Sequence, residues 1–359
     1  MMGETLSRDV GPVRPGEELP WASLEGYLRA ELGGLPDGFE VQQFLGGAAN
    51  LTYLLRFGEQ ALVLRRPPFG RIAPGGHDMR REYHALSQLW TVFPKAPRAF
   101  LHCSDPKIVG ADFVIMEFRD GVVVRGAIPQ ALAGHDDVGR RIGFAVVDAL
   151  AELHSVDPRQ SGLQDLGRPT GFVERQLAGW GRRWAAVEPV DGVVAMDEVA
   201  ARLARNQPRP QRASILHNDM KLDNCQFDPG NPDTVRSVFD WDMATLGDPL
   251  VDVGTLLNYW PDPSDTPEIR ATRHPGLEAI GLPTRSEVAT RYAGACDIDL
   301  SDLQWYEAFG TWKTAIICQQ LYDRYRRGET TDIRQATRGD HVPAMARRAL
   351  QLLDEGGHA

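Results

Sequence analysis

The sequence predicts an α+β protein with two lobes, a small one built on an antiparallel sheet and a larger one that is mainly helical. Short runs rich in β-branched and aromatic residues follow one another closely at residues 39–45, 51–57 and 61–66. From Asp136 onward, long runs with apolar residues at helical spacing dominate the chain. Strands and helices that are segregated along the sequence in this way are typical of the α+β class.

Length and composition fit an ordinary globular protein. A chain of 359 residues is long enough for one large domain or two smaller lobes. Its hydrophobic fraction of 42% and charged fraction of 25% exclude the collagen-like and disordered classes. The formal net charge of -10 argues against general binding to nucleic acid or to an anionic membrane surface.

The chain has no stretch that favours a membrane or a secreted location. Residues 1–20 are polar and rich in Gly and Pro, so we expect a flexible arm without the apolar core of a signal peptide. No stretch approaches the roughly 20 apolar residues of a membrane span. Four cysteines without C-x-x-C spacing favour a reducing, cytoplasmic environment over disulfides or a zinc site. We therefore expect no nucleic-acid or membrane partner, and the sequence does not indicate an oligomeric state.

The predicted small lobe combines helices with a meander of strands. The stretch WASLEGYLRAEL, residues 21–32, has helical spacing and stops at Gly33 and Gly34. The three strand runs are separated by GGAAN and GEQ, which indicates antiparallel pairing. A helix is predicted over residues 77–90 and a further strand over residues 113–118.

The predicted large lobe places long helices around a polar hairpin. Helices are expected over residues 138–155, 173–187, 305–327 and 343–353. Between them, ASILHNDMKLDNCQFD (residues 213–228) and TVRSVFDWD (residues 234–242) each have the pattern of a short strand that ends in polar residues.

The hairpin holds the side chains that phosphoryl transfer needs. Asp219 and Asn224 are close enough in sequence for one loop to turn both toward a single cavity. A carboxylate there can accept a proton from a hydroxyl, and an amide oxygen can ligate Mg²⁺. Asp240, at the end of the next apolar strand, adds a second oxygen ligand. Asx residues also cluster in ordinary turns, but H-x-D-x-x-x-x-N followed by a strand ending in Asp is a strong combined pattern.

The segment HNDMKLDN, residues 217–224, resembles the catalytic loop of the aminoglycoside phosphotransferases and choline-kinase-like enzymes, relatives of the protein kinases. FDWD, residues 239–242, resembles their metal-binding segment. The likeness runs from about Phe39 to the last helices and is greatest to the kinase-like domains linked to acyl-CoA dehydrogenases. It implies a bilobal protein-kinase-like fold, with a nucleotide-binding lobe at residues 1–118 and a catalytic and acceptor-binding lobe at residues 119–359.

The resemblance implies a role for each matching residue of the hairpin. Asp219 becomes the catalytic base, Asn224 a metal ligand and Asp240 the principal metal ligand. His217 matches a loop histidine that maintains the shape of the loop. Asp252, in GDPLVDVGTLL, matches an aspartate that supports the loop, although an Asp near a helix start is also a plain cap.

Two residues of this region keep two interpretations each. Asp242 stands where protein kinases carry Gly, and it either assists metal binding through water or caps the next turn. Lys221 either stabilises charge on the transferred phosphate or faces solvent.

The predicted nucleotide site begins between the first two strands, in LGGAANLTYLL. Gly46 and Gly47 allow the backbone to approach a phosphate closely, and Asn50 is the polar residue that follows them. The protein-kinase pattern Gly-x-Gly-x-x-Gly is absent, and the form found here resembles the phosphotransferase families. A Gly-Gly pair between strands is also an ordinary hairpin turn.

The third strand carries a departure from the family pattern. Arg65 occupies the position that usually holds Lys, and alternation along the strand turns Arg65 rather than Arg66 inward. A guanidinium can bind two phosphate oxygens, and the kinase-like domains linked to acyl-CoA dehydrogenases also tend to carry Arg here. The substitution leaves reduced use of ATP open. Glu82, in the following helix, is its expected partner.

The fourth strand leads into the expected hinge between the lobes. There the backbone groups of Met116, Glu117 and Phe118 are expected to bind a purine.

The implied activity is transfer of the γ-phosphate of ATP or GTP, with Mg²⁺, to a hydroxyl of a metabolite or antibiotic-like acceptor. Trp180, Arg183 and Arg324 lie in Arg-aromatic clusters that either bind an anionic acceptor or cover apolar surface. The missing glycine pattern and Arg65 also permit a catalytically weak, pseudokinase-like binding protein. A metal-dependent hydrolase is a third reading, although it lacks the paired histidines of a zinc hydrolase.

Overall fold

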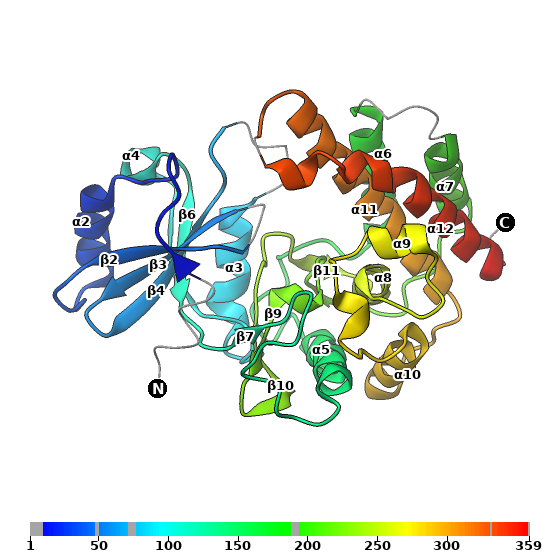
Figure 1. Cartoon of the computed structure of the whole chain (residues 1–359), viewed down its shortest axis with the longest axis horizontal. Helices are drawn as coiled ribbons and strands as arrows, with labels where there is room; N and C mark the ends of the chain where they lie inside the picture. Colours follow the sequence, from blue (N-terminus) through cyan, green and yellow to red (C-terminus); the bar gives the residue numbers. More distant parts are fainter. Residues whose placement is uncertain (1–9, 47–49, 71–76, 188–193, 331, 358–359) are drawn as a thin grey trace.

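The computed structural model describes residues 10–46, 50–70, 77–187, 194–330 and 332–357. Two lobes lie side by side along the longest axis, one built on a sheet and the other on helices (Figure 1). The predicted α+β architecture is confirmed. No helix in the described part of the chain is long and apolar enough to cross a membrane.

The small lobe is a six-stranded antiparallel sheet in the order β1-β2-β3-β4-β6-β5. Its strands are β1 (Val10–Gly11), β2 (Glu40–Phe44), β3 (Leu51–Phe57), β4 (Gln60–Arg66), β5 (Ala99–Cys103) and β6 (Phe113–Glu117). The predicted meander is β2-β3-β4. In the register, Arg65 of β4 lies between Thr52 of β3 and Val114 of β6, at the centre of the sheet.

Three helices cover this sheet: α2 (Trp21–Leu32), α3 (Met79–Leu89) and the short α4 (Pro106–Val109). The side chains of Leu24 and Leu28 on the inner face of α2 are completely buried. The side chain of Asp78 caps α3 by accepting from the amide of Arg81 at 2.9 Å. The apolar side chains of α3 belong to the same continuous core as the helical lobe, so α3 joins the two parts.

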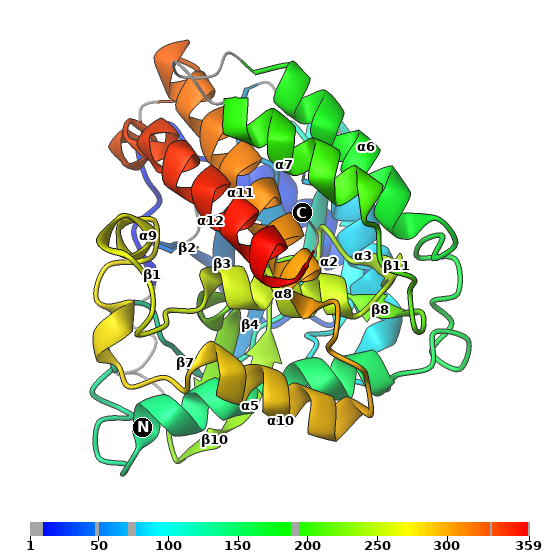
Figure 2. The ribbon, with the colours of Figure 1, turned by 90° about the vertical axis from the view of Figure 1, so that its right-hand side faces the viewer.

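The large lobe consists of α5 (Val138–Ser155), α6 (Phe172–Ala185), α7 (Val194–Arg205), α8 (Leu250–Tyr259), α9 (Pro267–Ala271), α10 (Arg285–Cys296), α11 (Leu303–Arg326) and α12 (Val342–Glu355). The long helix α11 packs on both α8 and α12 (Figure 2). The axes of α8 and α11 approach closely at two glycines. A Cβ on Gly254 would lie 2.2 Å from the carbonyl oxygen of Tyr306, and one on Gly310 would lie 2.9 Å from that of Gly254.

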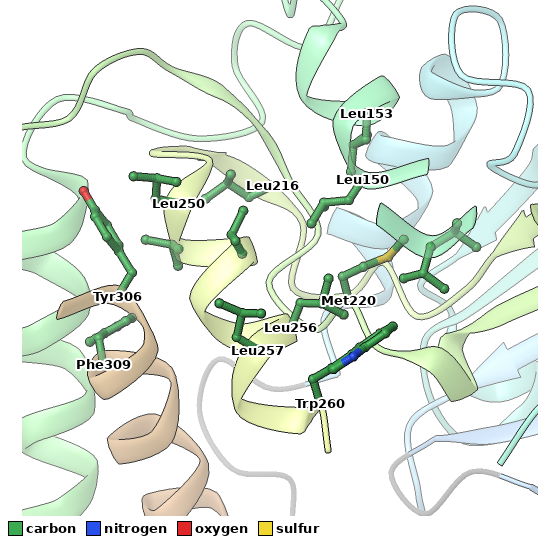
Figure 3. Packing of buried hydrophobic residues seen from close by; sticks show 14 of the residues in the cluster. Leu150, Leu153, Leu216, Met220, Leu250, Leu256, Leu257, Trp260, Tyr306 and Phe309 are labelled. Atoms are coloured by element: carbon green, nitrogen blue, oxygen red, sulfur yellow. The ribbon is translucent and has the colours of Figure 1, made fainter. Parts of the chain in front are cut away.

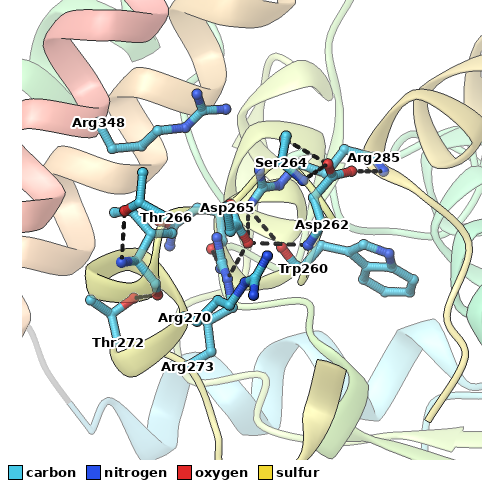
Figure 4. A network of polar contacts seen from close by, with 12 residues as sticks. Trp260, Asp262, Ser264, Asp265, Thr266, Arg270, Thr272, Arg273, Arg285 and Arg348 are labelled. Atoms are coloured by element: carbon cyan, nitrogen blue, oxygen red, sulfur yellow. Dashed lines mark hydrogen bonds and ion pairs between the residues drawn. The ribbon is translucent and has the colours of Figure 1, made fainter. Parts of the chain in front are cut away.

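Helix α8 is buried along nearly its whole length and organises the core beside the polar loop (Figure 3). Met220 of that loop, Leu257 of α8 and Phe309 of α11 all belong to this core. A buried network of ion pairs holds the far end of α8 (Figure 4). There Asp265 binds Arg273 at 3.0 Å and Arg285 at 2.8 Å, and Arg285 also donates to the carbonyl of Trp260 at 2.9 Å.

The polar segment differs from the predicted hairpin. Residues 213–228, expected to form one strand, form two: β8 (Ser214–Leu216) and β9 (Cys225–Asp228), separated by a loop and the short 3-10 helix η1 (Leu222–Asn224). β8 pairs with β11 (Thr245–Gly247), whereas β9 pairs with β10 (Asn231–Val238) and β7 (Val122–Val123). The strand breaks because Asn218 has a left-handed backbone, with φ of 66°.

Candidate active site

Three neighbouring side chains surround the carboxylate of Asp219. Lys221 Nζ lies 2.9 Å from its Oδ2, and Asn224 Nδ2 donates to the same oxygen at 3.2 Å. Tyr259 Oη donates to its Oδ1 at 3.1 Å. Asn224 Nδ2 also donates to the backbone carbonyl of Asp219 at 2.8 Å, so the loop closes on itself as its spacing predicts. The Asp219 side chain is 19% exposed, so the carboxylate is sheltered and still accessible.

A fully buried carboxylate, that of Asp252 in α8, fixes the backbone of the loop. It accepts from the amides of His217 at 2.7 Å and Asn218 at 2.6 Å. His154 Nε2 lies 3.2 Å from Asp252, and its other ring nitrogen lies 2.7 Å from Tyr292 Oη. Burial opposes ionisation of Asp252, but these hydrogen bonds hold its pKa below the ordinary value. Asp252 does not cap its own helix, because its carboxylate is used by the loop.

His217 links the loop to the strand that carries Asp240. Its Nδ1 accepts from the amide of Asp219 at 3.2 Å, so the proton lies on Nε2, which donates to the carbonyl of Phe239 at 2.7 Å. Phe239 in turn donates its amide to the carbonyl of Asn224 at 2.9 Å. These bonds bring Asn224 and Asp240 to adjacent positions across the loop.

Arg65 joins the two lobes through its guanidinium. Its guanidinium binds Glu82 at 2.8 Å and Asp240 directly, and it lies 3.9 Å from Asp242. Asp240 takes a left-handed backbone, with φ of 70°, that turns it out of the strand. Arg65 therefore points toward Glu82 and the helical lobe, the inward direction that strand alternation predicts. Arg66 is buried on the opposite face, where it donates to the carbonyl of Val109 at 2.8 Å.

This cluster has one cation for three carboxylates, and the pKa values reflect that imbalance. Burial lowers the pKa of Arg65, but the three carboxylates outweigh it and raise the pKa. Burial raises the pKa of Asp240, but Arg65 brings it below the ordinary value. Burial raises the pKa of Asp242 to about 6, with the charge of Asp240 adding to the effect. Burial also raises the pKa of Glu82 to about 8, although the positive charge of Arg65 lowers it.

The donor set at this cluster fits a hard divalent cation. Asn224 turns its Nδ2 toward Asp219, so the amide oxygen is its remaining polar end, and Asp240 offers a carboxylate. Mg²⁺ prefers such oxygen ligands and takes the others from phosphates and water. Two further polar atoms, Arg65 Nε and Glu82 Oε2, are buried without a hydrogen-bond partner. The excess of carboxylate is the electrostatic condition that a cation would relieve.

The turn that leads into β3 contacts the same cluster. Asn50 donates to Asp242 at 3.2 Å and its Oδ1 lies 2.7 Å from His77 Nδ1, so Asp242 is held by the small lobe. A Cβ on Gly46 would lie 2.4 Å from a guanidinium nitrogen of Arg125, the end of a flexible side chain that can move aside. Gly47 lies outside the described residues.

The expected hinge segment stands at the end of β6. Met116 is buried and paired on both sides, with β4 and with β5. The amide of Glu117 donates to the carbonyl of Arg98 at 2.8 Å. Phe118 is the first residue beyond β6, so its backbone is not part of the sheet.

The three expected acceptor residues do not form one cluster. Arg183 stacks on Trp180 of the same helix, with its guanidinium carbon 4.3 Å from the ring centroid. Nζ of Lys313, in α11, lies 5.8 Å from the centroid of the same Trp180 ring. Arg324 is eleven residues further along α11, about 16 Å by helix rise, and its charge acts on His77 instead.

Three residues of the site were not found from the sequence: Tyr259, His154 and Lys313. Lys313 is only 3% exposed, and its Nζ donates to the carbonyl of Asn218 at 2.6 Å. A charged residue at an apolar helix position was the available signal for Lys313. Tyr259 and His154 look like ordinary core residues in the sequence. Lys221, left open between phosphate and solvent, pairs with Asp219.

The comparison with known proteins agrees with this geometry. Residues 40–287 match the family described as the phosphotransferase enzyme family. The chain belongs to this family. It is 32% identical to acyl-CoA dehydrogenase family member 11 of Rattus norvegicus over 359 residues, covering 97% of this chain and 45% of the relative. It is 30% identical to member 10 of Mus musculus over 349 residues, covering 96% of this chain and 32% of the relative. The chain thus spans less than half the length of these relatives, and the resemblance predicted from the sequence is confirmed.

Solved structures of this phosphotransferase family share the fold. A Ralstonia eutropha JMP134 protein assigned as an aminoglycoside phosphotransferase matches with a TM-score of 0.75 and 27% identity, covering 94% of this chain and 99% of that one. A variant of APH(4)-Ia in ternary complex with AMP-PNP and hygromycin B matches with a TM-score of 0.56, 16% identity and coverage of 91% and 98%. At that identity the second match concerns the fold alone. Together they confirm the bilobal kinase-like architecture.

Proposed function

We propose that the chain is a small-molecule kinase that transfers the γ-phosphoryl group of ATP or GTP to a hydroxyl. The observation that carries the proposal is the sheltered carboxylate of Asp219, held on both oxygens by Lys221, Asn224 and Tyr259. A carboxylate oriented in this way suits a base that accepts one proton from an acceptor hydroxyl. Asn224 contacts Asp219, and the bonds of Phe239 to His217 and Asn224 bring the neighbouring Asp240 to the loop, an arrangement that suits phosphoryl transfer.

In the proposed reaction, Asp219 accepts the acceptor's proton while the acceptor oxygen forms its bond to the γ-phosphorus. The bond from the γ-phosphorus to the bridging oxygen breaks, and the nucleoside diphosphate leaves with that electron pair. Lys221 stabilises the charge on the phosphoryl oxygens after giving up its contact with Asp219. His217 and Asp252 maintain the loop, and Asp242 faces the same cleft.

The nucleotide is proposed to lie between residues 1–118 and the catalytic lobe at residues 119–359. Asn224 and Asp240 would hold Mg²⁺, which supplies charge neutralisation of the nucleotide phosphates. Arg65, oriented by Glu82, would contact the phosphates. The turn at Gly46, Gly47 and Asn50 would cover them, and the hinge residues Met116, Glu117 and Phe118 would meet the base.

We infer that the acceptor carries a negative group, as in a phosphorylated compound or a coenzyme A thioester. Arg183 and Lys221 both act electrostatically on Lys313, so three cations share the region around Trp180 and Asp219. The positive charge of these three residues disfavours binding of a polycationic aminoglycoside. Arg324 could contribute only to an acceptor long enough to reach the cleft beside His77.

The experiment that tests the proposal is a screen of hydroxylated metabolites with Mg-ATP and Mg-GTP, read as formation of nucleoside diphosphate. We expect activity with an anionic acceptor and loss of that activity in Asp219→Asn, which keeps the shape of the side chain. Activity that survives in Asp219→Asn would remove Asp219 as the base.

A pseudokinase-like binding protein remains the second candidate, because Arg65 is already neutralised by Asp240 in this structure. Tight nucleotide binding without turnover of any acceptor would favour it. Phosphate release without an acceptor would favour a hydrolase instead.

A further inference from the structure

Lys313 is a buried cation to which the proposed reaction gives no step. It lies in the middle of α11, is 3% exposed, and has Trp312 and Thr314 as buried neighbours. Lysine is almost never fully buried unless a specific partner compensates for the loss of hydration. The compensating partner here is a backbone carbonyl on the catalytic loop, at 2.6 Å from Nζ.

The carbonyl that Lys313 binds belongs to Asn218, the residue whose backbone conformation directs the loop. Asn218 has a φ of 66°, a left-handed conformation that L-residues other than Gly seldom adopt. Its amide donates to Asp252 at 2.6 Å, and its side-chain amide donates to the carbonyl of Met243 at 2.9 Å. With Lys313 on the carbonyl, the backbone amide, the backbone carbonyl and the side-chain nitrogen of Asn218 each have a partner, and the next residue is Asp219.

The groups around Lys313 act on its ammonium in opposite directions. Burial lowers its pKa, and the positive charges of Arg183 and Lys221 add to that effect. The negative charges of Asp219 and Asp252 act in the opposite direction, but the pKa stays below its ordinary value. The contact that holds the ammonium in place is therefore the hydrogen bond to the carbonyl of Asn218.

We propose that Lys313 is a positioning residue, whose ammonium holds the left-handed Asn218 and thereby aims the carboxylate of Asp219. This inference rests on the proposed function in one respect, that Asp219 is the base. A misdirection of the base by about 1 Å is enough to reduce turnover by roughly 100-fold. Helix α11 packs on α8 (Figure 2), so its contact with Asn218 also ties the loop to the helical core.

The first test measures the loop itself and does not require catalysis. In Lys313→Met, which keeps the length of the side chain, we expect hydrogen exchange at the amides of residues 217–219 to accelerate at least about tenfold. Exchange in β3 and β4 should stay unchanged. The matched controls are Lys107→Met, at an exposed position of α4, and Thr311→Val, at a buried position of α11. Both should leave the loop amides as they are.

The second test uses the acceptor found in the screen. We expect Lys313→Met to lower kcat by roughly 10- to 100-fold while KM for the nucleotide changes less than about twofold, since the defect lies in orientation. Lys313→Arg keeps the charge and should recover part of kcat. Because Arg does not deprotonate, the loss of kcat at alkaline pH should also move to higher pH in that variant.

Two results would overturn the proposal. One is unchanged loop exchange in a folded Lys313→Met protein whose only defect is a lower melting temperature. The other is a raised KM for the acceptor with kcat intact, which would make Lys313 an acceptor-binding residue. If no acceptor is ever phosphorylated, the proposed function fails, and the exchange experiment still decides the role of Lys313.

Discussion

At the scale of single residues, the site is defined by what holds each oxygen of Asp219. Lys221 and Asn224 share Oδ2, and both are within five residues of Asp219, so their contacts follow from the local pattern. Tyr259 holds Oδ1 from 40 residues away. Lys313 reaches the carbonyl of Asn218 from 95 residues away. Sequence patterns report neighbours along the chain, so the approach of Asn224 to Asp219 was predicted, whereas the pairing of Lys221 was left open. The contacts of Tyr259 and Lys313 depend on how the helices pack.

The hydrogen bond from Tyr259 gives a prediction for kcat. In Tyr259→Phe, Oδ1 of Asp219 loses its donor and the carboxylate is free to rotate. A hydrogen bond to a charged group contributes about 1.5–3 kcal/mol, so we expect kcat to fall by roughly tenfold or more. KM for the nucleotide should not change, because Tyr259 belongs to the helical lobe. Steady-state kinetics would measure both, with Tyr27→Phe on α2 as control. An unchanged kcat would show that Oδ1 needs no donor.

Glu82 gives a prediction for stability against pH in the absence of nucleotide. Burial raises its pKa from 4.5 to about 8. Between those values the folded protein holds a proton on Glu82 that the unfolded chain has released, so rising pH favours unfolding. The stabilisation is complete below pH 4.5 and is lost as pH rises through 8. Each pH unit in this window costs at most about 1.4 kcal/mol.

The measurement is the free energy of unfolding in urea at several pH values across that window. Glu82→Gln does not titrate and can still accept from Arg65, so its stability should fall less steeply with pH than that of the wild type. Glu25→Gln, on the exposed face of α2, is the control. Equal slopes for the wild type and Glu82→Gln would mean that Glu82 stays ionised.

At the scale of elements, the helices were more predictable than the short strands. The predicted bounds of residues 21–32 and 138–155 match α2 and α5, because apolar periodicity over three or more turns is a strong local signal. A loop at residues 217–224 was predicted, but the pairing of β8 and β9 with different strands on its two sides was not. It depends on the left-handed Asn218, whose conformation is stabilised by Asp252, Met243 and Lys313 rather than by its neighbours in sequence.

The crossing of α8 and α11 gives a prediction for Gly254. A methyl group at this position would lie 2.2 Å from the backbone carbonyl of Tyr306, and a backbone atom cannot move aside as a flexible side chain can. We expect Gly254→Ala to lower the free energy of unfolding by about 1–3 kcal/mol or more. It should also reduce kcat, because α8 carries Asp252 and Tyr259.

Chemical denaturation would measure the loss, and the control is Gly179→Ala in α6. A Cβ on Gly179 meets nothing within 4 Å, so there the substitution should raise stability by about 0.5–1 kcal/mol. A Gly254→Ala protein as stable as the wild type would show that the two helices can separate without cost.

At the scale of the whole molecule, the two lobes meet through charged residues as well as through the apolar core. Arg65 of the sheet binds Asp240 of the helical lobe, and Asn50, in the turn just before β3, binds Asp242. The division at residue 118 stays a prediction. The sheet ends at Glu117, but the core of α3 is continuous with that of the helical lobe. The sequence does not tell which lobe α3 packs against, because its apolar residues would be buried equally well in the core of either lobe.

The contact between Arg65 and Asp240 gives the final prediction, which concerns how the metal and the nucleotide bind. Asp240 is neutralised by Arg65, so Mn²⁺ or Mg²⁺ alone must compete with an intact ion pair. A nucleotide offers Arg65 its phosphates instead, which releases Asp240. We therefore expect either metal alone to leave the melting temperature nearly unchanged, and the metal with AMP-PNP to raise it, since a ligand that binds only the folded state stabilises that state.

Replacing Arg65 separates this coupling from simple weak binding. In Arg65→Met, Asp240 and Asp242 lose their nearby cation, so Mn²⁺ alone should bind more tightly than it binds the wild type. Calorimetric titration without nucleotide would measure the difference, with Arg56→Met on β3 as control. Because Arg65 would contact the phosphates, AMP-PNP should bind more weakly to the same variant. If Mn²⁺ binds the wild type and Arg65→Met equally well, Arg65 does not compete with the metal for Asp240, and metal and nucleotide bind independently.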